Sequence, residues 1–492
     1  MKNWLKAGAS LALLSMATPV LAKAHEENGQ ANAAEAQKAA ALAEALRAAD
    51  LWVESQRQYL KIPAVSVAVA QGDKTVWAKG FGTTDRAGRH AATADTIYSI
   101  CSISKLFTSV ALMQQWEQGK VALDAPITDY LPWAKLAADP RESVPITLRG
   151  ALTHSAGLPR ESDFPYWTAP DYRFPTQAEM RAKIGSQSPL YPAETTWQYS
   201  NLGLTLVGET VEAVSGTPYA DYVRANILAP LGLKDTRPNL PKDLYGKQMA
   251  VGWGALKPDG TRPEIGPFDT AGITPAAGFT SSVNDLARFA SWTFRLAKSG
   301  KAEVLRPSTL REMERVHYVS PDWNTSWGLG FAVRNQNGTT VVGHGGSCPG
   351  YRSALRIAPS EEMAVAVAIN AMDNPDAIAG NIAALIQARG AAANYDPVEG
   401  VTLEDYAGVY DAQPWTAEFM AIPWAGGLIQ IDRDSTEPAD RIYRLKPLAK
   451  DRFQVVSDKG ELRDTVTFER DASGKVVALV QHSNRYRRVR GL

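Results

Sequence analysis

Alternating hydrophobic and polar positions predict strands in two separated parts of this chain. Residues 64–70 alternate as a strand does, Gly72 and Asp73 make a turn, and residues 75–82 return, which together predict a hairpin. After a long region of helices and loops, strand patterns return at residues 329–335, 339–343, 353–357 and 363–369. Because strands from both ends enclose the helices, we expect an α+β fold. One antiparallel sheet would be flanked by helices and carry an inserted helical lobe.

Helical periodicity and a change of composition indicate the domain limits. Residues 31–61 and 376–389 carry helical patterns. Residues 391–402 have the composition of a linker, and the chain then changes to short alternating segments at about ten-residue spacing, a pattern typical of a small all-β domain. These segments are residues 406–410, 419–422, 427–431, 441–445, 452–456, 465–470 and 476–482. The predicted division is a main domain at residues 31–390, a linker at 391–402 and an all-β domain at 403–492.

The first 22 residues have the features of a secretory signal. Lys2 and Lys6 give a positive start, an apolar stretch follows, and small residues precede a cleavage point after Ala22, with a second point after Ala24 nearly as well placed. The apolar stretch is shorter than the roughly 20 residues that a membrane-spanning helix needs. We therefore expect a periplasmic or secreted protein with no membrane span once the signal is removed.

Composition narrows the classes of function. Lys and Arg together number 52, as do Asp and Glu, so the formal net charge is zero, which disfavours binding to nucleic acid through counterion release. Two cysteines cannot form a disulfide framework, and six scattered histidines without a His-Glu-x-x-His pattern do not predict a zinc site. We expect an enzyme without a metal or cofactor, acting on a small molecule, peptide or ester. The sequence does not predict an oligomeric state.

A Ser-x-x-Lys pattern, Ser102 and Lys105, stands where helical periodicity begins. Backbone N–H groups at a helix start favour developing negative charge, and a desolvated Lys on the same face can become a free amine that takes the serine proton. The pattern is short, and a capping Ser beside a surface Lys would produce it as well.

Two further patterns carry polar groups suited to catalysis. Tyr199 and Asn201 directly precede a predicted helix, where a phenol near an ammonium can be driven toward phenolate and an amide can meet a substrate carbonyl or Lys105. His344 precedes Gly345, Gly346 and Ser347 at a predicted strand end, where glycines permit close approach and His344 can supply a donor. Each of these patterns alone is also compatible with packing or local capping.

The three patterns in this order resemble the serine β-lactamase and penicillin-binding-protein superfamily, in particular the branch that is similar to class C β-lactamases. That branch includes D-alanyl-D-alanine carboxypeptidases, D-aminopeptidases and esterases. Supporting segments are residues 98–105, 152–159, 278–282, 327–331 and 343–351. The resemblance covers residues 52–389 and implies the β-lactamase/transpeptidase-like fold. Residues from 403 onward resemble a lipocalin-like accessory barrel.

The resemblance implies a role for each site residue. Ser102 would be the acylated nucleophile, Lys105 its general base and Tyr199 a proton shuttle. The backbone N–H groups of Ser102 and Ser347 would form the oxyanion hole. Substrate would be held by Asn201, His344, Gly345, Gly346 and Arg352.

The main departure from the family is His-Gly-Gly where many β-lactamases have Lys-Thr-Gly. A neutral His344 gives no fixed cation for a substrate carboxylate unless Arg352, Arg356 or Arg160 supplies one. We therefore expect an acyl-enzyme hydrolase, foremost a peptidase or amidase acting on small or D-amino-acid-containing peptides. A carboxylesterase and a penicillin-binding or weak β-lactamase protein are the alternatives.

Cys101 and Cys348 adjoin the predicted site, one before Ser102 and the other after Ser347. If the resemblance holds, the helix start and the strand end face each other, and the two cysteines can form a disulfide. The alternative is a pair of small buried hydrophobic residues.

Overall fold

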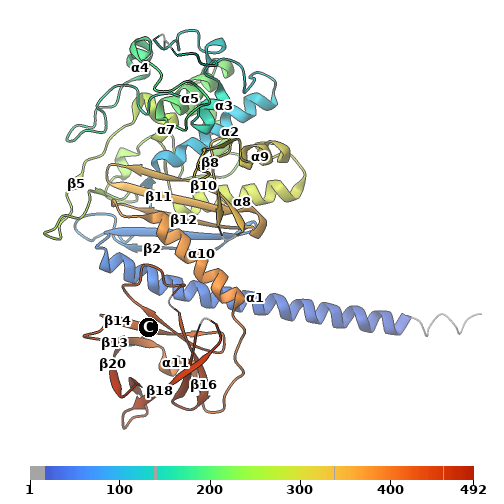
Figure 1. Cartoon of the computed structure of the whole chain (residues 1–492), viewed down its shortest axis with the longest axis vertical. Helices are drawn as coiled ribbons and strands as arrows, with labels where there is room; N and C mark the ends of the chain where they lie inside the picture. Colours follow the sequence, from blue (N-terminus) through green and yellow to red (C-terminus); the bar gives the residue numbers. More distant parts are fainter. Residues whose placement is uncertain (1–16, 138–140, 337, 441, 458) are drawn as a thin grey trace, which may run out of the picture. The chain divides into compact units, whose positions relative to one another are not determined.

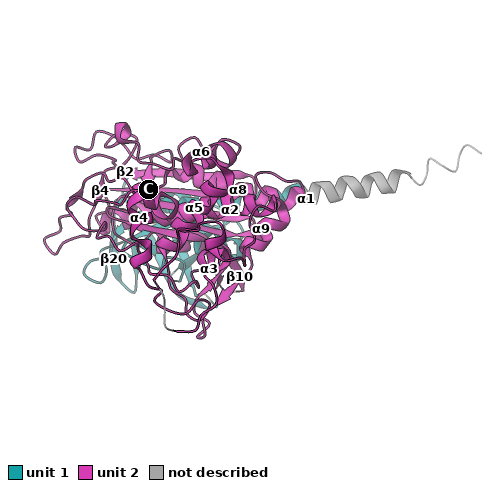
Figure 2. Cartoon of the chain, turned by 90° about the horizontal axis from the view of Figure 1, so that it is seen from above, with its two compact units in different colours: residues 1–52, 384–492 teal, residues 53–383 magenta. Residues whose placement is uncertain are grey.

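The computed structural model describes residues 17–137, 141–336, 338–440, 442–457 and 459–492. The predicted signal peptide, residues 1–22, falls mostly outside these ranges. The chain forms two compact units, one of residues 53–383 and the other of residues 1–52 with 384–492 (Figure 2). Among the helices within these ranges, none has the length and apolar character needed to cross a membrane.

The larger unit contains an eight-stranded antiparallel sheet with the order β2-β1-β12-β11-β10-β9-β8-β7. Val65 in β1 pairs with Ile369 in β12, so the first and last strands of the region lie side by side. This confirms the predicted sheet built from distant segments. The strands are β1 (Ala64–Gln71), β2 (Lys74–Gly82), β7 (Tyr318–Val319), β8 (Ser326–Trp327), β9 (Ala332–Gln336), β10 (Thr339–Cys348), β11 (Tyr351–Ala358) and β12 (Met363–Ile369).

Helices of the same unit pack beside this sheet, and α2, α3, α5 and α7 gather in a helical lobe (Figure 1). The helices are α2 (Ser104–Glu117), α3 (Leu148–Thr153), α4 (Gln177–Lys183), α5 (Asn201–Ser215), α6 (Tyr219–Val223), α7 (Thr274–Ala277), α8 (Val283–Ser299) and α9 (Pro307–Glu314). Helices α1 (Ala17–Tyr59) and α10 (Pro375–Ala391) contain the residues at which the two units divide. Two short ribbons complete the unit, β3 (Tyr98–Ser99) with β6 (Thr280–Ser281) and β4 (Gly252–Trp253) with β5 (Glu264–Ile265).

Helix α2 is the centre of the hydrophobic core. Its residues from Ser104 to Gln115 are all buried, which is the pattern of a helix surrounded by other elements. Phe107 stacks on Phe279 with 5.2 Å between ring centroids and packs at 5.0 Å against Phe289 on α8. This packing fixes the helix whose first turn carries Lys105.

The smaller unit contains a closed barrel of eight antiparallel strands, which confirms the predicted all-β barrel. Its elements are α11 (Leu403–Tyr406), β13 (Gly408–Asp411), β14 (Glu418–Trp424), β15 (Gly427–Asp432), β16 (Tyr443–Ala449), β17 (Arg452–Val456), β18 (Leu462–Arg470), β19 (Val476–Gln481) and β20 (Asn484–Arg490). Strand β20, which the sequence pattern does not predict, pairs with β13 and closes the barrel. Within this unit, Nε1 of Trp52 on α1 donates to the carbonyl of Ser435 at 2.8 Å.

Candidate active site

Ser102 lies in a 3-10 turn, η1 (Cys101–Ile103), that leads directly into α2. The sequence predicts the first α-helical turn here, but Cys101 has a φ of 50°, and the regular helix starts only at Ser104. The Ser104 hydroxyl donates to the Cys101 carbonyl at 2.5 Å and accepts from the backbone N–H of Phe279 at 2.9 Å. These bonds tie the turn to the helical lobe and hold Ser102 half-buried.

The Lys105 amine has three partners at hydrogen-bond distance. Nζ lies 3.1 Å from Ser102 Oγ, 2.8 Å from Asn201 Oδ1 and 2.7 Å from the carbonyl oxygen of Ala276 on α7. The side chain is fully buried. Burial lowers the pKa of Lys105 well below its usual value, and the charge of Glu161 opposes that shift without reversing it. The structure thus brings a Lys with neutral-amine character to the Ser102 hydroxyl.

Asn201 connects Lys105 to a carboxylate that the sequence does not single out. Its Oδ1 accepts from Lys105, and its Nδ2 donates to Glu161 Oε1 at 2.8 Å. The Tyr166 hydroxyl also donates to Glu161. Since both ends of the Asn201 amide are engaged within the protein, the structure favours the predicted contact with Lys105 over a direct contact with a substrate carbonyl.

Tyr199 directly precedes Ser200, which caps α5 by accepting from the N–H of Gly203 at 2.8 Å. The Tyr199 ring has Lys105 Nζ at 4.8 Å and the Arg160 guanidinium at 5.0 Å from its centroid. Burial raises the pKa of Tyr199 above its usual value, and a hydrogen bond with Ser102 offsets only part of the rise. Burial thus opposes the phenolate that a nearby ammonium would favour.

His344 lies on β10, packed against Tyr199 and Trp327 with ring centroids 6.1 and 5.4 Å away. Its Nδ1 is 2.6 Å from the carbonyl of Gly345, and a carbonyl only accepts, so Nδ1 carries the proton. Burial lowers the pKa of His344 to about 3, with the Lys105 charge as a smaller cause. Nε2 is buried with no partner among the described residues. We expected His344 to offer a hydrogen-bond donor, but with the proton on Nδ1 the unpartnered Nε2 is an acceptor.

Strand β10 has an open edge beyond Gly343. Strand β9 pairs with β10 only from Thr339 to Gly343, whereas β11 pairs with it as far as Cys348. Successive residues of an antiparallel strand turn their N–H groups to opposite edges, and Cys348 faces Tyr351 across a two-residue hairpin loop. The N–H of Ser347 therefore faces the open edge.

Gly345 and Gly346 lie on this open stretch. Gly345 is exposed and Gly346 is buried. A Cβ at Gly346 would lie 2.1 Å from the carbonyl oxygen of Ile100, so only glycine lets β10 approach η1 this closely.

The arginines considered for a substrate carboxylate have different surroundings. Arg356 contacts Asp376 on α10 at 3.1 Å and is already paired. Arg352 shares its face of β11 with Arg356, since side chains alternate along a strand, whereas Ser353 faces η1 and donates to Ile100. Arg352, predicted to bind substrate, is therefore directed away from Ser102. Arg160 lies beside Tyr199 and also pairs with a carboxylate, Glu161 at 3.3 Å, but its side chain is 60% exposed whereas that of Arg356 is 12% exposed.

Cys101 and Cys348 form a disulfide with a Cα–Cα distance of 5.8 Å. This settles the alternative that the sequence left open. The bridge joins the residue before Ser102 to the residue after Ser347, and both sulfur-bearing residues are buried.

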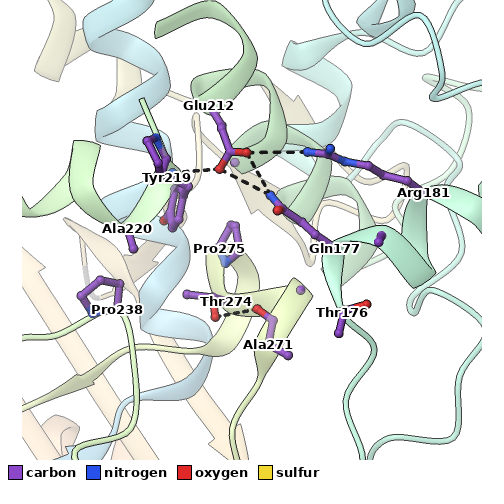
Figure 3. A pocket seen from close by; sticks show the side chains of 14 residues that line it. Thr176, Gln177, Arg181, Glu212, Tyr219, Ala220, Pro238, Ala271, Thr274 and Pro275 are labelled. Atoms are coloured by element: carbon purple, nitrogen blue, oxygen red, sulfur yellow. Dashed lines mark hydrogen bonds and ion pairs between the residues drawn. The ribbon is translucent and has the colours of Figure 1, made fainter. Parts of the chain in front are cut away.

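A cavity of about 670 Å³ is lined by Thr274 and Pro275 of α7, and Ser102 is not among its lining residues (Figure 3). Glu212, Gln177 and Arg181 form its polar end, and Pro275 of α7 lines another wall. None of the predicted site residues is among the described residues that line it. Across the described ranges, no group of three or more His, Cys, Asp or Glu side chains is arranged to hold a metal ion.

Glu161 and His154 are the site residues that sequence reasoning missed. His154 lies in the 152–159 segment, has its ring 4.3 Å from that of Tyr199, and accepts the Ser200 N–H at Nδ1 at 3.1 Å. Glu161 follows that segment directly. The only available signal was this adjacency, because neither residue belongs to a periodic pattern.

Comparisons with known proteins place this geometry in context. The family model described as Beta-lactamase matches residues 50–389. The D-alanyl-D-alanine-carboxypeptidase/endopeptidase AmpH of Escherichia coli is 30% identical over 203 residues, 41% of this chain and 52% of AmpH. Two further curated relatives are matched over 54% and 58% of their length, so the chain spans little more than half of these proteins.

Solved structures share the fold at lower identity. The octameric penicillin-binding protein homologue from Pyrococcus abyssi aligns with a TM-score of 0.60 and 24% identity, covering 90% of this chain and 99% of that one. The D-amino acid amidase from Ochrobactrum anthropi SV3 aligns with a TM-score of 0.56 and 23% identity, covering 70% and 98%. Because the family model matches most of the chain, including the segment that holds Ser102 and Lys105, the chain belongs to the beta-lactamase family of serine hydrolases.

Proposed function

We propose that this enzyme forms an acyl-enzyme on Ser102 and acts as a peptidase or amidase on small or D-amino-acid-containing peptides. The observation that carries the proposal is the bonding of Lys105. A neutral amine has two N–H groups and one lone pair. Two of its three partners, the Asn201 and Ala276 oxygens, only accept, so they take the two N–H groups. The lone pair is left for the Ser102 hydroxyl, 3.1 Å away.

Acylation follows from this arrangement. Lys105 takes the hydroxyl proton as Ser102 Oγ attacks the substrate carbonyl, and the backbone N–H groups of Ser102 and Ser347 stabilise the negative charge on the carbonyl oxygen. Tyr199, a phenol at neutral pH, donates its proton to the leaving group and is reprotonated from Lys105. The same groups, used in reverse, activate the water that releases the acyl group.

Substrates with N–H donors match the recognition half of the site better than anionic ones. Nε2 of His344 offers an acceptor and no positive charge. The open edge of β10 can pair with an extended backbone, as in strand addition. Arg160 is the exposed cation beside Tyr199 for a carboxylate at the far end of a peptide. The names of AmpH and of the D-amino acid amidase agree with an amide substrate of D configuration.

A substrate panel with intact-mass detection tests the proposal. We expect D-alanyl p-nitroanilide to be turned over faster than the L-aminoacyl anilides, with a transient adduct on Ser102 that Ser102→Ala abolishes. Full activity in Ser102→Ala would refute the acyl-enzyme. Turnover of p-nitrophenyl butyrate alone would identify an esterase, and a benzylpenicillin adduct that persists for hours would identify a penicillin-binding protein.

We also propose that the protein is exported, on the basis of the charged and apolar pattern at residues 1–22. Expression in a bacterial host followed by fractionation and N-terminal sequencing tests this. A mature chain starting at Lys23 or His25 in the periplasmic fraction is expected, and an unprocessed chain in the cytoplasm would contradict it.

A further inference from the structure

The disulfide occupies an unusual place relative to the reacting groups. Cys101 and Cys348 are 247 residues apart in sequence, yet each is the immediate neighbour of a residue whose backbone N–H is proposed to bind the oxyanion. The bridge is buried beneath the site, with Cys101 fully covered and Cys348 4% exposed. One covalent link therefore joins the two halves of the proposed oxyanion hole.

The two halves belong to different parts of the fold. Ser102 is on η1, which the Ser104 hydroxyl and the pairing of Ile100 with Phe279 attach to the helical lobe. Ser347 is on β10, which belongs to the sheet. An oxyanion hole works only if both donors are preorganised at the same point, so the junction between lobe and sheet must be held within a fraction of an ångström.

Non-covalent contacts also cross this junction. The Ser353 hydroxyl on β11 donates to the Ile100 carbonyl at 2.9 Å, and Gly346 admits that same carbonyl against β10. The contact between Gly346 and the Ile100 carbonyl is a close packing contact and not a hydrogen bond. Farther from the reacting groups, the Tyr98 and Ser66 hydroxyls lie 2.8 Å apart, and the N–H of Gly330 donates to the Leu152 carbonyl at 3.1 Å. Among these contacts the disulfide is the covalent one, and it adjoins both proposed donors.

The backbone at Cys101 adds a reason for the bridge. Its φ of 50° lies in the left-handed region, which side chains bearing a Cβ seldom adopt. The turn aims the N–H of Ser102, and a residue in this conformation has more favourable alternatives when nothing holds it. The covalent bond to β10 opposes that relaxation.

We propose that the Cys101–Cys348 disulfide is a positioning element that sets the separation of the Ser102 and Ser347 N–H donors, so that efficient hydrolysis requires the oxidised protein. This inference rests on the proposed function. The bridge takes no part in the chemistry and acts through the two backbone groups next to it. The bonds between η1 and the lobe do not involve sulfur, so the fold is expected to survive loss of the bridge.

The test compares the full chain with the double variant Cys101→Ser/Cys348→Ser. For p-nitrophenyl butyrate we expect kcat to fall about 10- to 100-fold, less than the loss of a complete donor, with KM changed less than about threefold. Phenylboronic acid, which forms a tetrahedral adduct with a reactive serine, should bind more weakly by the same factor. Ser353→Ala, which keeps the disulfide and removes the neighbouring bond, should lose less activity than the double variant.

Reduction of the wild-type chain provides a second route that needs no substitution. Dithiothreitol transfers two electrons and two protons to the bridge, giving two thiols and its own cyclic disulfide. Activity should fall to the level of the double variant and return on reoxidation, whereas the double variant should not respond.

Labelling of Ser102 by a fluorophosphonate separates the outcomes. If the wild type is labelled but the double variant keeps the wild-type kcat per labelled site and loses only thermal stability, the positioning role is overturned. If the wild type itself is not labelled, the proposed function fails and this inference fails with it.

Discussion

The two sides of the candidate site are built on opposite principles. On the helical side, Lys105 and Asn201 are buried and every polar end is engaged by another protein group. On the strand side, His344 keeps an unpartnered Nε2 and β10 has an open edge. The difference separates reactivity, which needs a dry and saturated environment to shift pKa values, from recognition, which needs unsatisfied groups that a substrate can complete.

The largest effect is expected on the helical side, at Lys105. Lys105→Met removes the base and should lower kcat for p-nitrophenyl butyrate by roughly 100- to 10,000-fold. Lys105→Arg should lose as much, because a guanidinium stays protonated at neutral pH and has no lone pair to offer Ser102. Circular dichroism of both variants verifies the fold. Substantial activity in Lys105→Arg would show that the neutral amine is not the base.

Glu161 should affect the same amine through its charge. The carboxylate raises the pKa of Lys105 against the lowering by burial, so Glu161→Gln should lower that pKa further. Activity requires the neutral amine and is lost as pH falls through the Lys105 pKa, so the acid limb of the pH–rate profile should move to lower pH. We expect kcat at neutral pH to fall about tenfold, because the Asn201 amide exchanges a charged acceptor for a weaker neutral one. An acid limb that does not move would contradict the coupling.

On the strand side, a smaller and substrate-dependent effect is expected. His344→Ala should raise KM for amide substrates about tenfold, which is the loss in binding expected when one hydrogen bond is removed. The effect on esters should be smaller, because esters lack the N–H. His344→Gln supplies an acceptor on the same strand and is the matched control. Because burial lowers the pKa of His344 to about 3, no histidine titration from this residue should appear in the rate profile between pH 5 and 8. Equal KM increases for esters and amides would argue against an acceptor role.

Arg352→Ala should have the smallest effect. The side chain lies on the face of β11 directed away from η1, so kcat/KM for a peptide with a free carboxylate should change by less than about twofold. Arg160→Ala is the comparison, with a larger expected increase in KM. If Arg352→Ala has the larger effect, the assignment of the two faces is wrong.

Hydrophobic patterning predicted strands at both ends of this region, and the structure pairs two of them, β1 and β12, from Val65 to Gln71. Both strands are buried at almost every position, which fixes their place inside the sheet. It missed β20, in which four of the seven residues are arginines and most side chains are exposed. The position of a strand that closes a barrel is determined by its backbone hydrogen bonds to the two neighbouring strands, so its sequence need not show a buried hydrophobic face.

The site was predictable only as far as short motifs allow. Ser102, Lys105 and Tyr199 were found from spacing and resemblance, but the direction in which each pKa moves depends on burial, which no motif contains. The tautomer of His344 depends on the carbonyl of Gly345, a local contact visible only in three dimensions. Glu161 meets Asn201 across 40 residues, and nothing in the sequence links the two.

The short helix α7 gives residues far from the chemistry a way to affect it. The Ala276 carbonyl that orients Lys105 is next to Pro275, and Pro275 rests on Gly208 of α5, where a Cβ would lie 2.3 Å from the proline ring. Any side chain at position 208 would push α7 and displace the catalytic amine. A mutation at Gly208 can therefore change the rate of hydrolysis while every residue that contacts the substrate stays the same.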